Sequence, residues 1–326
     1  MKILITGATG LIGSRLSRQL HDLGHEIVIT SRDRERAIAK LPFARDVVEW
    51  DPVRTPAPAA AFAGVEAVVN LMGEPVAGRW TAGRKRAIRD SRVLGTRNLV
   101  EGMRGARQSV TGTRNLVAGM RTAAESSPNS MLPEALVSAS AIGYYGEGGD
   151  RVLAEDSRPG EDFLARVCVD WEGEAARAVT AGARVVIMRT GLVLAREGGA
   201  LASMLPIFKA GFGGRLGSGR QWMSWIHVDD LVALYVEALT NPAFEGPLNA
   251  VAPGPVTNSE LTETLARALR RPAVLPAPAF ALKLALGEMA GAVLESQRVI
   301  PRAAVSASFR FKHETLEAAL RALLKG

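Results

Sequence analysis

The first thirteen residues contain the pattern that most limits the folds open to this chain. A short apolar run, Ile3 to Ile5, predicts a buried strand, and Gly7, Gly10 and Gly13 follow it at intervals of three. An amphipathic segment, Leu11 to Leu23, then predicts a helix. A strand, a tight turn and a helix in this order are the opening of a dinucleotide-binding fold.

Each glycine has a separate role if the ligand is a phosphate. Gly7 allows the sharp exit from the strand, Gly10 lets the backbone approach a pyrophosphate, and Gly13 lets the helix pack close to the strand. The helix N-terminus adds unpaired N–H groups and a partial positive charge. We therefore predict dinucleotide binding rather than a turn without a ligand, with contacts at Gly7, Thr9, Gly10, Leu11, Ile12 and Gly13.

The end of the second predicted strand, Glu26 to Thr30, indicates which coenzyme is preferred. An acidic residue there would bind the ribose 2′-OH of NAD, whereas an arginine accommodates the 2′-phosphate of NADP. Ser31 and Arg32 occupy this place. The pattern favours NADP(H), and the alternative is that Arg32 is a solvated charge.

Further strands are predicted at 46–50, 65–71, 133–140 and 184–189, in a parallel sheet of order 3-2-1-4-5-6. Asp51 follows the third strand and is expected near the adenine. Leu71 ends the fourth strand beside the glycine turn, and Met72 follows it. They are candidates for the cofactor wall, and ordinary core packing accounts for them equally well.

Composition excludes several classes of protein. The net charge is +7, but the arginines are scattered along predicted helices, so we expect a solvated surface and no nucleic-acid partner. No apolar run approaches the ~20 residues of a membrane span, and no signal-type segment precedes the first strand. The single cysteine, Cys168, rules out an internal disulfide and favours the cytoplasm. We expect no metal, because the Cys and His residues lack metal-ligand spacing.

One helical region, 95–128, contains a duplication. Residues 95–104 return as residues 112–121 with nine of ten positions identical. Since seventeen residues turn a helix by roughly 100° beyond whole turns, both apolar faces cannot meet the sheet. We predict that one copy covers the sheet while the other extends the helix or forms a projecting turn. Partner binding by the extra copy is the alternative.

Two later helices have recognisable starts. Asp229 or Asp230 is expected to cap a helix at 231–239 rather than to act in catalysis. Thr257 and Glu260 form a capping box for a helix at 261–269.

Several motifs resemble the extended short-chain dehydrogenase/reductase superfamily, namely Thr6–Gly13, Trp225–Asp230 and Gly246–Asn249. Within it, other motifs are similar to bacterial "epimerase family proteins", an atypical branch with a small C-terminal domain of unassigned function: Asn70–Pro75, Gly143–Gly146, Arg189–Leu194 and Gly217–Gln221.

The resemblance implies an α/β fold, with a Rossmann-type doubly wound parallel sheet and a small, mostly helical substrate domain. The implied NADP-binding domain covers 1–193 plus 226–252, and the substrate domain covers 194–225 plus 253–326, with the substrate between them. Val193, within the Arg189–Leu194 motif, joins the expected cofactor residues.

The superfamily's hydride-transferring members use a Tyr and, four residues later, a Lys on the helix after the fifth strand. Glu172 matches the acid that usually stands four residues after this Lys, which leaves Leu164 and Cys168 at the two positions. A shift by one residue offers only Phe163 and Val167. The sequence therefore lacks the Tyr–Lys pair at this place.

Other residues are candidates to replace it. Ser140 stands where the superfamily places a hydroxyl donor, and Tyr144 and Tyr145 follow in the loop expected to face the cofactor. A tyrosine needs a neighbouring cation to act at neutral pH, and Arg92 or Arg220 could supply one. The alternative is that both tyrosines pack against the nicotinamide or the C-terminal domain.

Arg92 also replaces a polar Asn of the superfamily's helix motif. A buried arginine near the cofactor needs an anion, either a nucleotide phosphate or a substrate carboxylate. A salt bridge on the helix surface is the alternative. The resulting hypothesis is that the chain is an NADP(H)-binding enzyme, oxidoreductase-like or epimerase-like, that acts on a small substrate that could be anionic. The alternative hypothesis is a non-catalytic NADP(H) sensor.

Overall fold

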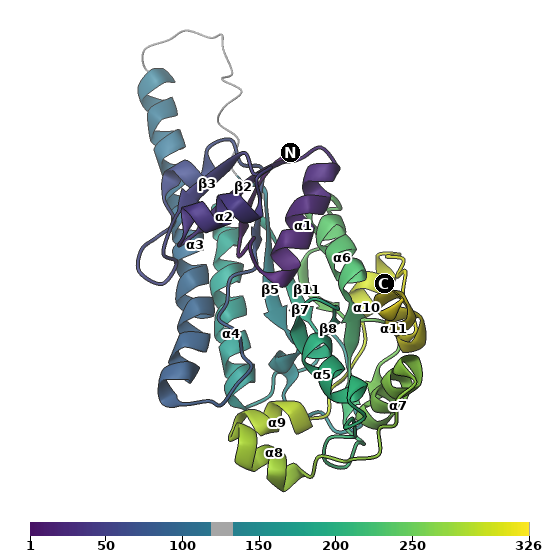
Figure 1. Ribbon diagram of the computed structural model, residues 1–326. Coiled ribbons are helices and arrows are strands. Elements are labelled where there is room, and N and C mark those ends of the chain that lie inside the picture. The colour runs from purple at the N-terminus through teal and green to yellow at the C-terminus, as the bar shows by residue number, and fades with distance from the viewer. Residues whose placement is uncertain (119–132, 326) are drawn as a thin grey trace.

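The computed structural model describes residues 1–118 and 133–325 (Figure 1). Within these ranges, a seven-stranded parallel sheet is formed, in spatial order, by β3 (Asp46–Glu49), β2 (Glu26–Ser31), β1 (Lys2–Thr6), β4 (Ala67–Asn70), β5 (Ala135–Ala141), β7 (Arg184–Thr190) and β11 (Gly246–Ala250). The predicted order of six strands is confirmed, and β11 extends the sheet beyond β7. The fold is the expected Rossmann-type doubly wound α/β fold.

Helices cover both faces of this sheet (Figure 1). In chain order they are α1 (Leu11–Asp22), α2 (Arg34–Lys40), α3 (Ala82–Ala118), α4 (Phe163–Ala176), α5 (Gly199–Lys209), α6 (Val228–Thr240), α7 (Asn258–Leu269), α8 (Ala279–Leu286), α9 (Met289–Leu294), α10 (Arg302–Ser306) and α11 (Leu316–Leu324). Short 3-10 turns are η1 (Ala59–Phe62), η2 (Ile142–Tyr145) and η3 (Arg177–Ala181). Short strands pair as β6 (Val152–Leu153) with β13 (Arg298–Val299), β8 (Leu192–Leu194) with β10 (Trp225–His227), and β9 (Trp222–Met223) with β12 (Val256–Thr257).

Strand β1 shows why the sheet is buried on both faces. Ile3 and Ile5 belong to the apolar cluster that contains the inner faces of α1 and α6. Leu4, whose side chain points to the opposite face, belongs to the cluster that contains Leu99 and Met103 of α3. A strand that is apolar at consecutive positions is typical of a parallel sheet covered by helices on both sides.

The glycine turn after β1 has the geometry predicted for two of its glycines. Gly7 has a φ of +68°, and a Cβ there would lie 2.6 Å from the carbonyl oxygen of Leu71. A Cβ on Gly13 would lie 2.3 Å from the Gly7 carbonyl oxygen. Both positions therefore require glycine, the first for the turn and the second for the close approach of α1 to the turn.

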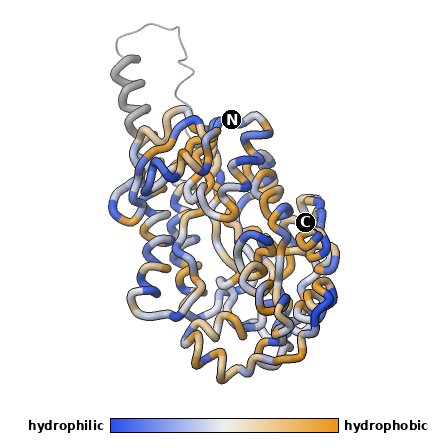
Figure 2. The backbone as a smooth tube through the Cα atoms, viewed as in Figure 1, coloured by the Kyte–Doolittle hydropathy of each residue, from blue (hydrophilic) through white to orange (hydrophobic). Residues whose placement is uncertain are grey.

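The C-terminal part of the chain is mostly helical, as the family resemblance implied. Helices α5, α7 and α11 share an apolar cluster that includes Leu205, Leu265 and Leu320. Helix α8 is also apolar (Figure 2), yet Phe280 and Leu284 on it are 75% and 79% exposed. The division of the chain into a cofactor domain and a substrate domain stays a prediction.

Helix α3 contains the duplicated segment. The first copy, 95–104, covers the sheet with Leu99, Val100 and Met103, all of which are buried. The helix continues through Ala118, so the described part of the second copy extends it. The last residues of that copy, 119–121, lie outside the described residues.

The predicted cap of α6 is wrong. The helix begins at Val228, three residues earlier than expected, so Asp229 and Asp230 lie inside its first turn. His227 is the N-cap, and its Nδ1 accepts a hydrogen bond from Asp229 N at 3.1 Å. The Asp230 carboxylate instead accepts the backbone N–H groups of Lys312 and His313.

The capping box of α7 is confirmed. Thr257 Oγ1 accepts from Glu260 N at 3.2 Å, and Glu260 Oε2 accepts from Thr257 N at 2.6 Å. This reciprocal pair satisfies two backbone donors at the start of the helix.

Candidate cofactor site

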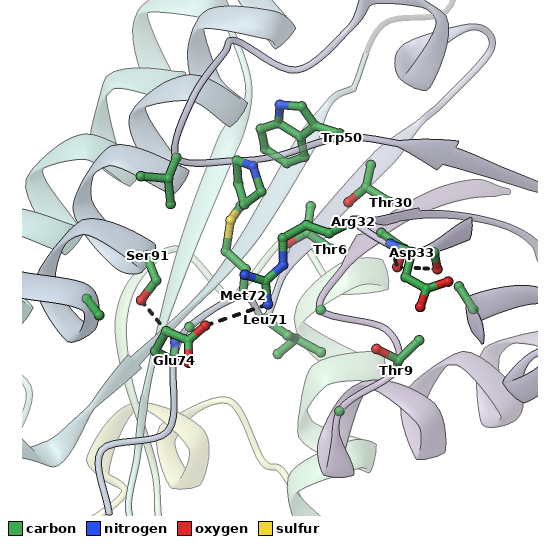
Figure 3. Close-up of a pocket in the computed structure, with 18 of the residues that line it drawn as sticks. Thr6, Thr9, Thr30, Arg32, Asp33, Trp50, Leu71, Met72, Glu74 and Ser91 are labelled. Carbon is green, nitrogen blue, oxygen red and sulfur yellow. Dashed lines mark hydrogen bonds and ion pairs between the residues drawn. The ribbon is translucent and has the colours of Figure 1, made fainter. Parts of the chain in front are cut away.

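A cavity of about 670 Å³ opens at the carboxyl ends of β1, β2 and β4 (Figure 3). Its walls come from the glycine turn, the segment after β2, the segment after β4 and the start of α3. Ligands of doubly wound folds bind at this edge, beside the point where the strand order reverses. Seven predicted cofactor residues line it, namely Gly7, Thr9, Gly10, Ser31, Arg32, Leu71 and Met72.

The N-terminus of α1 forms one end of the cavity. Its N-cap is Gly10, and no side chain caps the helix. Lys40 of α2 donates from Nζ to the carbonyl oxygen of Thr9 at 2.7 Å, which fixes the turn from the other side. The first N–H groups of α1 have no side-chain cap, and Gly10 leaves room beside them, so this helix start can bind an anionic group such as a pyrophosphate.

Basic side chains gather at the end of β2. Arg32 is 69% exposed, and its Nη2 lies 3.6 Å from Glu74 Oε1 across the cavity (Figure 3). Arg36, one helical turn further on, also lines the cavity. The nearby acid, Asp33, is the N-cap of α2, and its Oδ1 accepts from Arg36 N at 2.9 Å. The guanidinium groups of Arg32 and Arg36 are therefore available to a phosphate at the end of β2. The Asp33 carboxylate is instead engaged as the N-cap of α2.

A buried polar network supports the floor of the cavity. The Asn70 side chain accepts from Thr6 Oγ1 at 2.9 Å and donates to Thr96 Oγ1 at 2.8 Å and Ser138 Oγ at 3.1 Å. Trp171 Nε1 donates to the same Thr96 oxygen at 2.8 Å. These bonds fix the carboxyl ends of β1, β4 and β5 against α3 and α4, and satisfied buried networks of this kind are rigid.

The remaining predicted cofactor residues do not line this cavity. Leu11, Ile12 and Val193 pack against the apolar cluster shared by α1 and α6. Gly13 lies in the first turn of α1 against the Gly7 carbonyl oxygen. Asp51 lies in a neighbouring hollow, where its Oδ1 accepts from Val53 N and its Oδ2 pairs with Arg54 at 3.1 Å.

Arg92 lies beside the cavity rather than on its lining. Its Nη1 donates to the carbonyl oxygens of Glu74 at 2.9 Å and Ile88 at 3.1 Å. The guanidinium carbon also lies 5.3 Å from the centre of the Trp171 ring. Burial lowers the pKa of the Arg92 guanidinium. In the part of the chain that the structure describes, Arg92 forms no ion pair with a carboxylate, and its pairing with an anionic ligand stays a prediction.

Ser140, at the end of β5, is buried and engaged with an acid. Its Oγ donates to Glu172 Oε1 at 2.6 Å. Glu172 is in turn held by Arg189, whose Nε and Nη2 donate to its two oxygens at 2.9 and 2.8 Å. The Ser140 proton is committed to the carboxylate, so its hydroxyl is left as an acceptor toward any further group.

The two tyrosines occupy different positions around Arg189. The Arg189 guanidinium carbon lies 3.5 Å from the centre of the Tyr144 ring. Tyr145 is 2% exposed, and its hydroxyl donates to Asn249 Oδ1 at 2.7 Å and accepts from Arg189 Nη1 at 3.0 Å. Burial raises the pKa of Tyr145 to about 12, although Arg189 opposes this. The cation beside both rings is thus Arg189, and not Arg92 or Arg220 as predicted.

Leu164 and Cys168, which the sequence comparison predicts at the Tyr and Lys positions, both lie on helix α4. Leu164 contacts the turn at Gly143, where an added Cβ would lie 3.5 Å from Leu164 Cβ. Cys168 is buried, and burial raises the pKa of its thiol to about 12. A thiol of that pKa stays protonated at neutral pH and is no nucleophile.

Sequence reasoning missed part of the site. Trp50 and Val53 line the cavity beyond β3, and Arg86, Asp90 and Ser91 line it from α3. Arg36 and Lys40 were also overlooked. Their spacing of four residues on a helix directly after β2 was a signal that could have found them.

Comparison with known proteins gives the family. A model described as the NAD dependent epimerase/dehydratase family matches residues 3–251, about three quarters of the chain. The chain belongs to this family. A second model, a domain of unknown function named DUF1731, matches residues 277–323. The two matches agree with the resemblance seen in the sequence motifs.

Relatives within the epimerase/dehydratase family match from end to end. "Epimerase family protein SDR39U1 homolog, chloroplastic" of Arabidopsis thaliana is 41% identical, covering 100% of this chain and 87% of its own length. "Epimerase family protein YfhF" of Bacillus subtilis is 34% identical, covering 99% and 98%. The crystal structure of human epimerase family protein SDR39U1 with NADPH is 31% identical, with a TM-score of 0.80 and 99% of both chains covered.

A more distant structure agrees in fold alone. The UDP-glucuronic acid 4-epimerase from Bacillus cereus, solved with NAD, is 16% identical with a TM-score of 0.72. In the described ranges of this chain, no helix is both long and apolar enough to cross a membrane.

Proposed function

We propose that this member of the epimerase/dehydratase family binds NADP(H) in the cavity at the carboxyl ends of β1, β2 and β4. The observation that carries the proposal is the pairing of Arg32 and Arg36 at the end of β2, where the Asp33 carboxylate already caps α2. The two guanidinium groups suit a 2′-phosphate, because arginine binds phosphate through charge-assisted hydrogen bonds. The human relative solved with NADPH supports the same coenzyme.

The other parts of the cavity suit the rest of a dinucleotide. The uncapped start of α1 is placed for the pyrophosphate, and Trp50 and Val53 offer an apolar surface toward the adenine end. Gly10 keeps side-chain atoms away from the phosphate path. When bound, the nicotinamide would supply hydride transfer to or from a carbon atom of the substrate.

We propose that the chemistry is oxidoreductase-like or epimerase-like and proceeds on a small substrate without a Tyr–Lys pair, since Leu164 and Cys168 stand at those positions. Ser140 would accept a hydrogen bond from a substrate hydroxyl, because its own proton is bound to Glu172. Tyr144, half-buried and stacked on Arg189, is the proton donor we favour. Tyr145 would hold the loop in place, because its hydroxyl is bound to Asn249 and Arg189.

A second function is a non-catalytic NADP(H) sensor located in the cytoplasm. The observation that favours it is the burial of Tyr145 and Cys168, two titratable groups near the expected nicotinamide position. The pKa of both Tyr145 and Cys168 is raised to about 12, so neither takes up a proton as a base at neutral pH. In this case the bound coenzyme would set the conformation of a surface that binds a partner.

Turnover separates the two functions. Purified protein with NADPH and pooled small carbonyl compounds is followed through the absorbance of the reduced nicotinamide. Sustained oxidation that Tyr144→Phe slows in kcat, with the NADPH affinity retained, supports the enzyme and the role of Tyr144. Tight NADPH binding without oxidation across a broad pool supports the sensor, and absence of NADPH binding contradicts both.

A further inference from the structure

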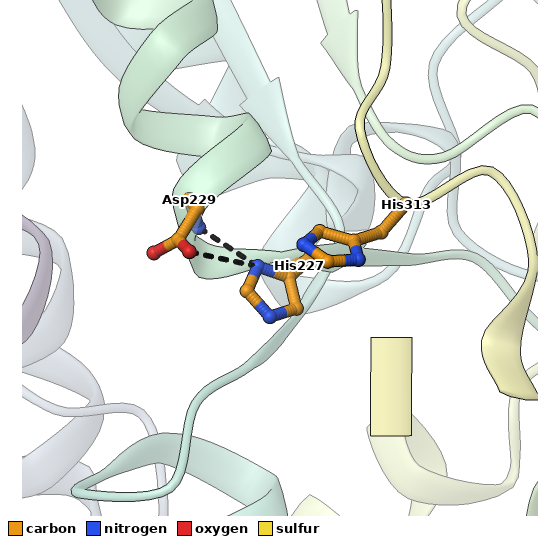
Figure 4. Close-up of side chains that lie close together, drawn as sticks. All are labelled: His227, Asp229 and His313. Carbon is orange, nitrogen blue, oxygen red and sulfur yellow. Dashed lines mark hydrogen bonds and ion pairs between the residues drawn. The ribbon is translucent and has the colours of Figure 1, made fainter. Parts of the chain in front are cut away.

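Three side chains with metal-binding chemistry meet away from the cofactor cavity (Figure 4). His227 ends β10, Asp229 lies in the first turn of α6, and His313 precedes α11 in the C-terminal part of the chain. One ligand-type atom from each side chain lies within 4.8 Å of the other two. His313 is more than eighty residues from the other two in sequence, which is why spacing arguments indicated no metal.

Two nitrogens of this cluster are buried without a partner. His227 is 2% exposed and His313 is 7% exposed. Among the described residues, neither His227 Nε2 nor His313 Nε2 has a hydrogen-bond partner. A buried polar atom is normally satisfied, so two such atoms in adjacent imidazoles indicate that this place is built for a further group.

We propose that His227, Asp229 and His313 bind a divalent transition-metal ion of the Zn²⁺ type, with water completing the coordination. Two imidazoles and one carboxylate form a ligand set that Zn²⁺ favours, whereas Mg²⁺ and Ca²⁺ prefer oxygen ligands alone. Asp229 is half exposed, with 51% of its side chain accessible, which gives an ion a path from solvent.

Binding requires a defined local adjustment. The two imidazole rings are stacked, with centroids 3.8 Å apart and planes inclined by 31°. Ligand atoms lie ~2.0–2.2 Å from Zn²⁺ in proteins, so the rings must turn out of this stack until their nitrogens converge. The Asp229 side chain can follow, because its Oδ1 is held only by a 3.6 Å ion pair with Arg15.

The hydrogen bonds of the neighbouring Asp230 suggest a structural role for the ion. Asp230 accepts from the backbone N–H groups of Lys312 and His313 at 2.7 and 3.0 Å, which fixes the segment that carries the second imidazole. The ion would therefore join the start of α6 to the segment before α11 and stabilise the contact between the sheet and the C-terminal helices.

Metal titration of the tag-free protein tests the proposal. We expect one equivalent of Zn²⁺ to bind with micromolar or tighter affinity and to raise the thermal midpoint, and EDTA to reverse the rise. Co²⁺ should give visible d–d absorption bands that Zn²⁺ abolishes. Absence of saturable binding, or bands that Zn²⁺ does not displace, would overturn the site.

Variants identify the ligands. His313→Gln should abolish the Co²⁺ bands, and His227→Asn should do the same while it retains an acceptor for Asp229 N. Asp229→Asn, at a half-exposed position, should weaken the affinity by roughly tenfold or more, since loss of even an outer-shell partner costs ~10–100-fold. The remaining histidines provide matched controls, and His21→Gln and His25→Gln should bind as the unmodified protein does. Binding that survives His313→Gln, or that His21→Gln removes, contradicts the assignment.

Discussion

Arg189 and Glu172 form a buried ion pair with two hydrogen bonds, of 2.9 Å from Nε to Oε1 and 2.8 Å from Nη2 to Oε2. Their side chains are 3% and 10% exposed. Burial lowers the pKa of Arg189, but the bonds and charge of Glu172 outweigh it and raise that pKa. Ser140 and Tyr145, two of the candidate catalytic residues, are hydrogen-bonded to this ion pair. The pair therefore connects β5, β7, η2 and α4.

Glu172→Gln should therefore destabilise the protein strongly. The change leaves the Arg189 charge buried without its counter-ion, and breaking a buried pair in this way costs about 3–5 kcal/mol. Urea unfolding at equilibrium measures the loss. Glu317→Gln is the control, because its pair with Arg321 at 2.7 Å is exposed and such pairs contribute ~0.2–1 kcal/mol. Equal losses in the two variants would contradict the role of the buried pair.

Gly13→Ala should weaken both the fold and coenzyme binding. The new Cβ would lie 2.3 Å from the Gly7 carbonyl oxygen, so α1 and the glycine turn must move apart. Overpacking of this kind costs about 1–3 kcal/mol, and NADPH affinity should fall with it. Thermal unfolding and NADPH titration of the same sample measure the two effects.

The matched control for that substitution is Gly173→Ala. Gly173 lies within α4, and a Cβ there would have no heavy atom within 4 Å apart from its neighbouring residues and the adjacent backbone of its own helix. Alanine in a helix interior is more stable than glycine by ~0.8–1.0 kcal/mol. We expect this variant to gain stability and to keep its NADPH affinity. A Gly13→Ala protein that behaves in the same way would refute the close packing at the turn.

The stability of the protein should depend on pH through Glu295. Burial, together with the charges of Asp162 and Glu147, raises the pKa of this carboxyl from 4.5 to about 7. Because the folded state holds the proton more tightly than the unfolded chain, this contribution is complete below pH 4.5 and is lost as the pH rises through about 7.

Glu295→Gln isolates the effect. The variant should show a flatter dependence of unfolding free energy on pH between 4.5 and about 7, the interval between the two pKa values. Glu263→Gln, at an exposed position of α7, should keep the slope of the unmodified protein. A slope that Glu295→Gln leaves unchanged would show that another group titrates in this interval.

Much of the fold was predictable because local patterns dictate it. Runs of apolar residues gave the strands, the φ of +68° at Gly7 favours glycine in the tight turn, and Gly13 packs against the nearby Gly7 carbonyl oxygen. The capping box of Thr257 and Glu260 was equally local. These features need no knowledge of how distant segments meet.

Other features depend on contacts that the sequence does not reveal. Asp230 resembled a helix cap, but its carboxylate binds backbone N–H groups of a segment more than eighty residues away. Tyr145 stays a candidate catalytic residue, and the sequence does not reveal that its hydroxyl is bound to Asn249 and to Arg189. In each case a long-range contact, formed only in the folded chain, takes up the group.

Coenzyme titration tests the central claim most directly. Calorimetry of the unmodified protein should give a higher affinity for NADPH than for NADH, because we propose that Arg32 and Arg36, which line the cavity, bind the 2′-phosphate. Arg32→Ala should weaken NADPH binding by about tenfold or more, since a hydrogen bond to a charged group contributes ~1.5–3 kcal/mol, and should leave NADH binding unchanged. Arg34→Ala, whose side chain bonds the Val47 carbonyl and pairs with Asp46, should change neither affinity. Equal affinity for the two coenzymes in the unmodified protein, or no measurable affinity for either, would contradict the account.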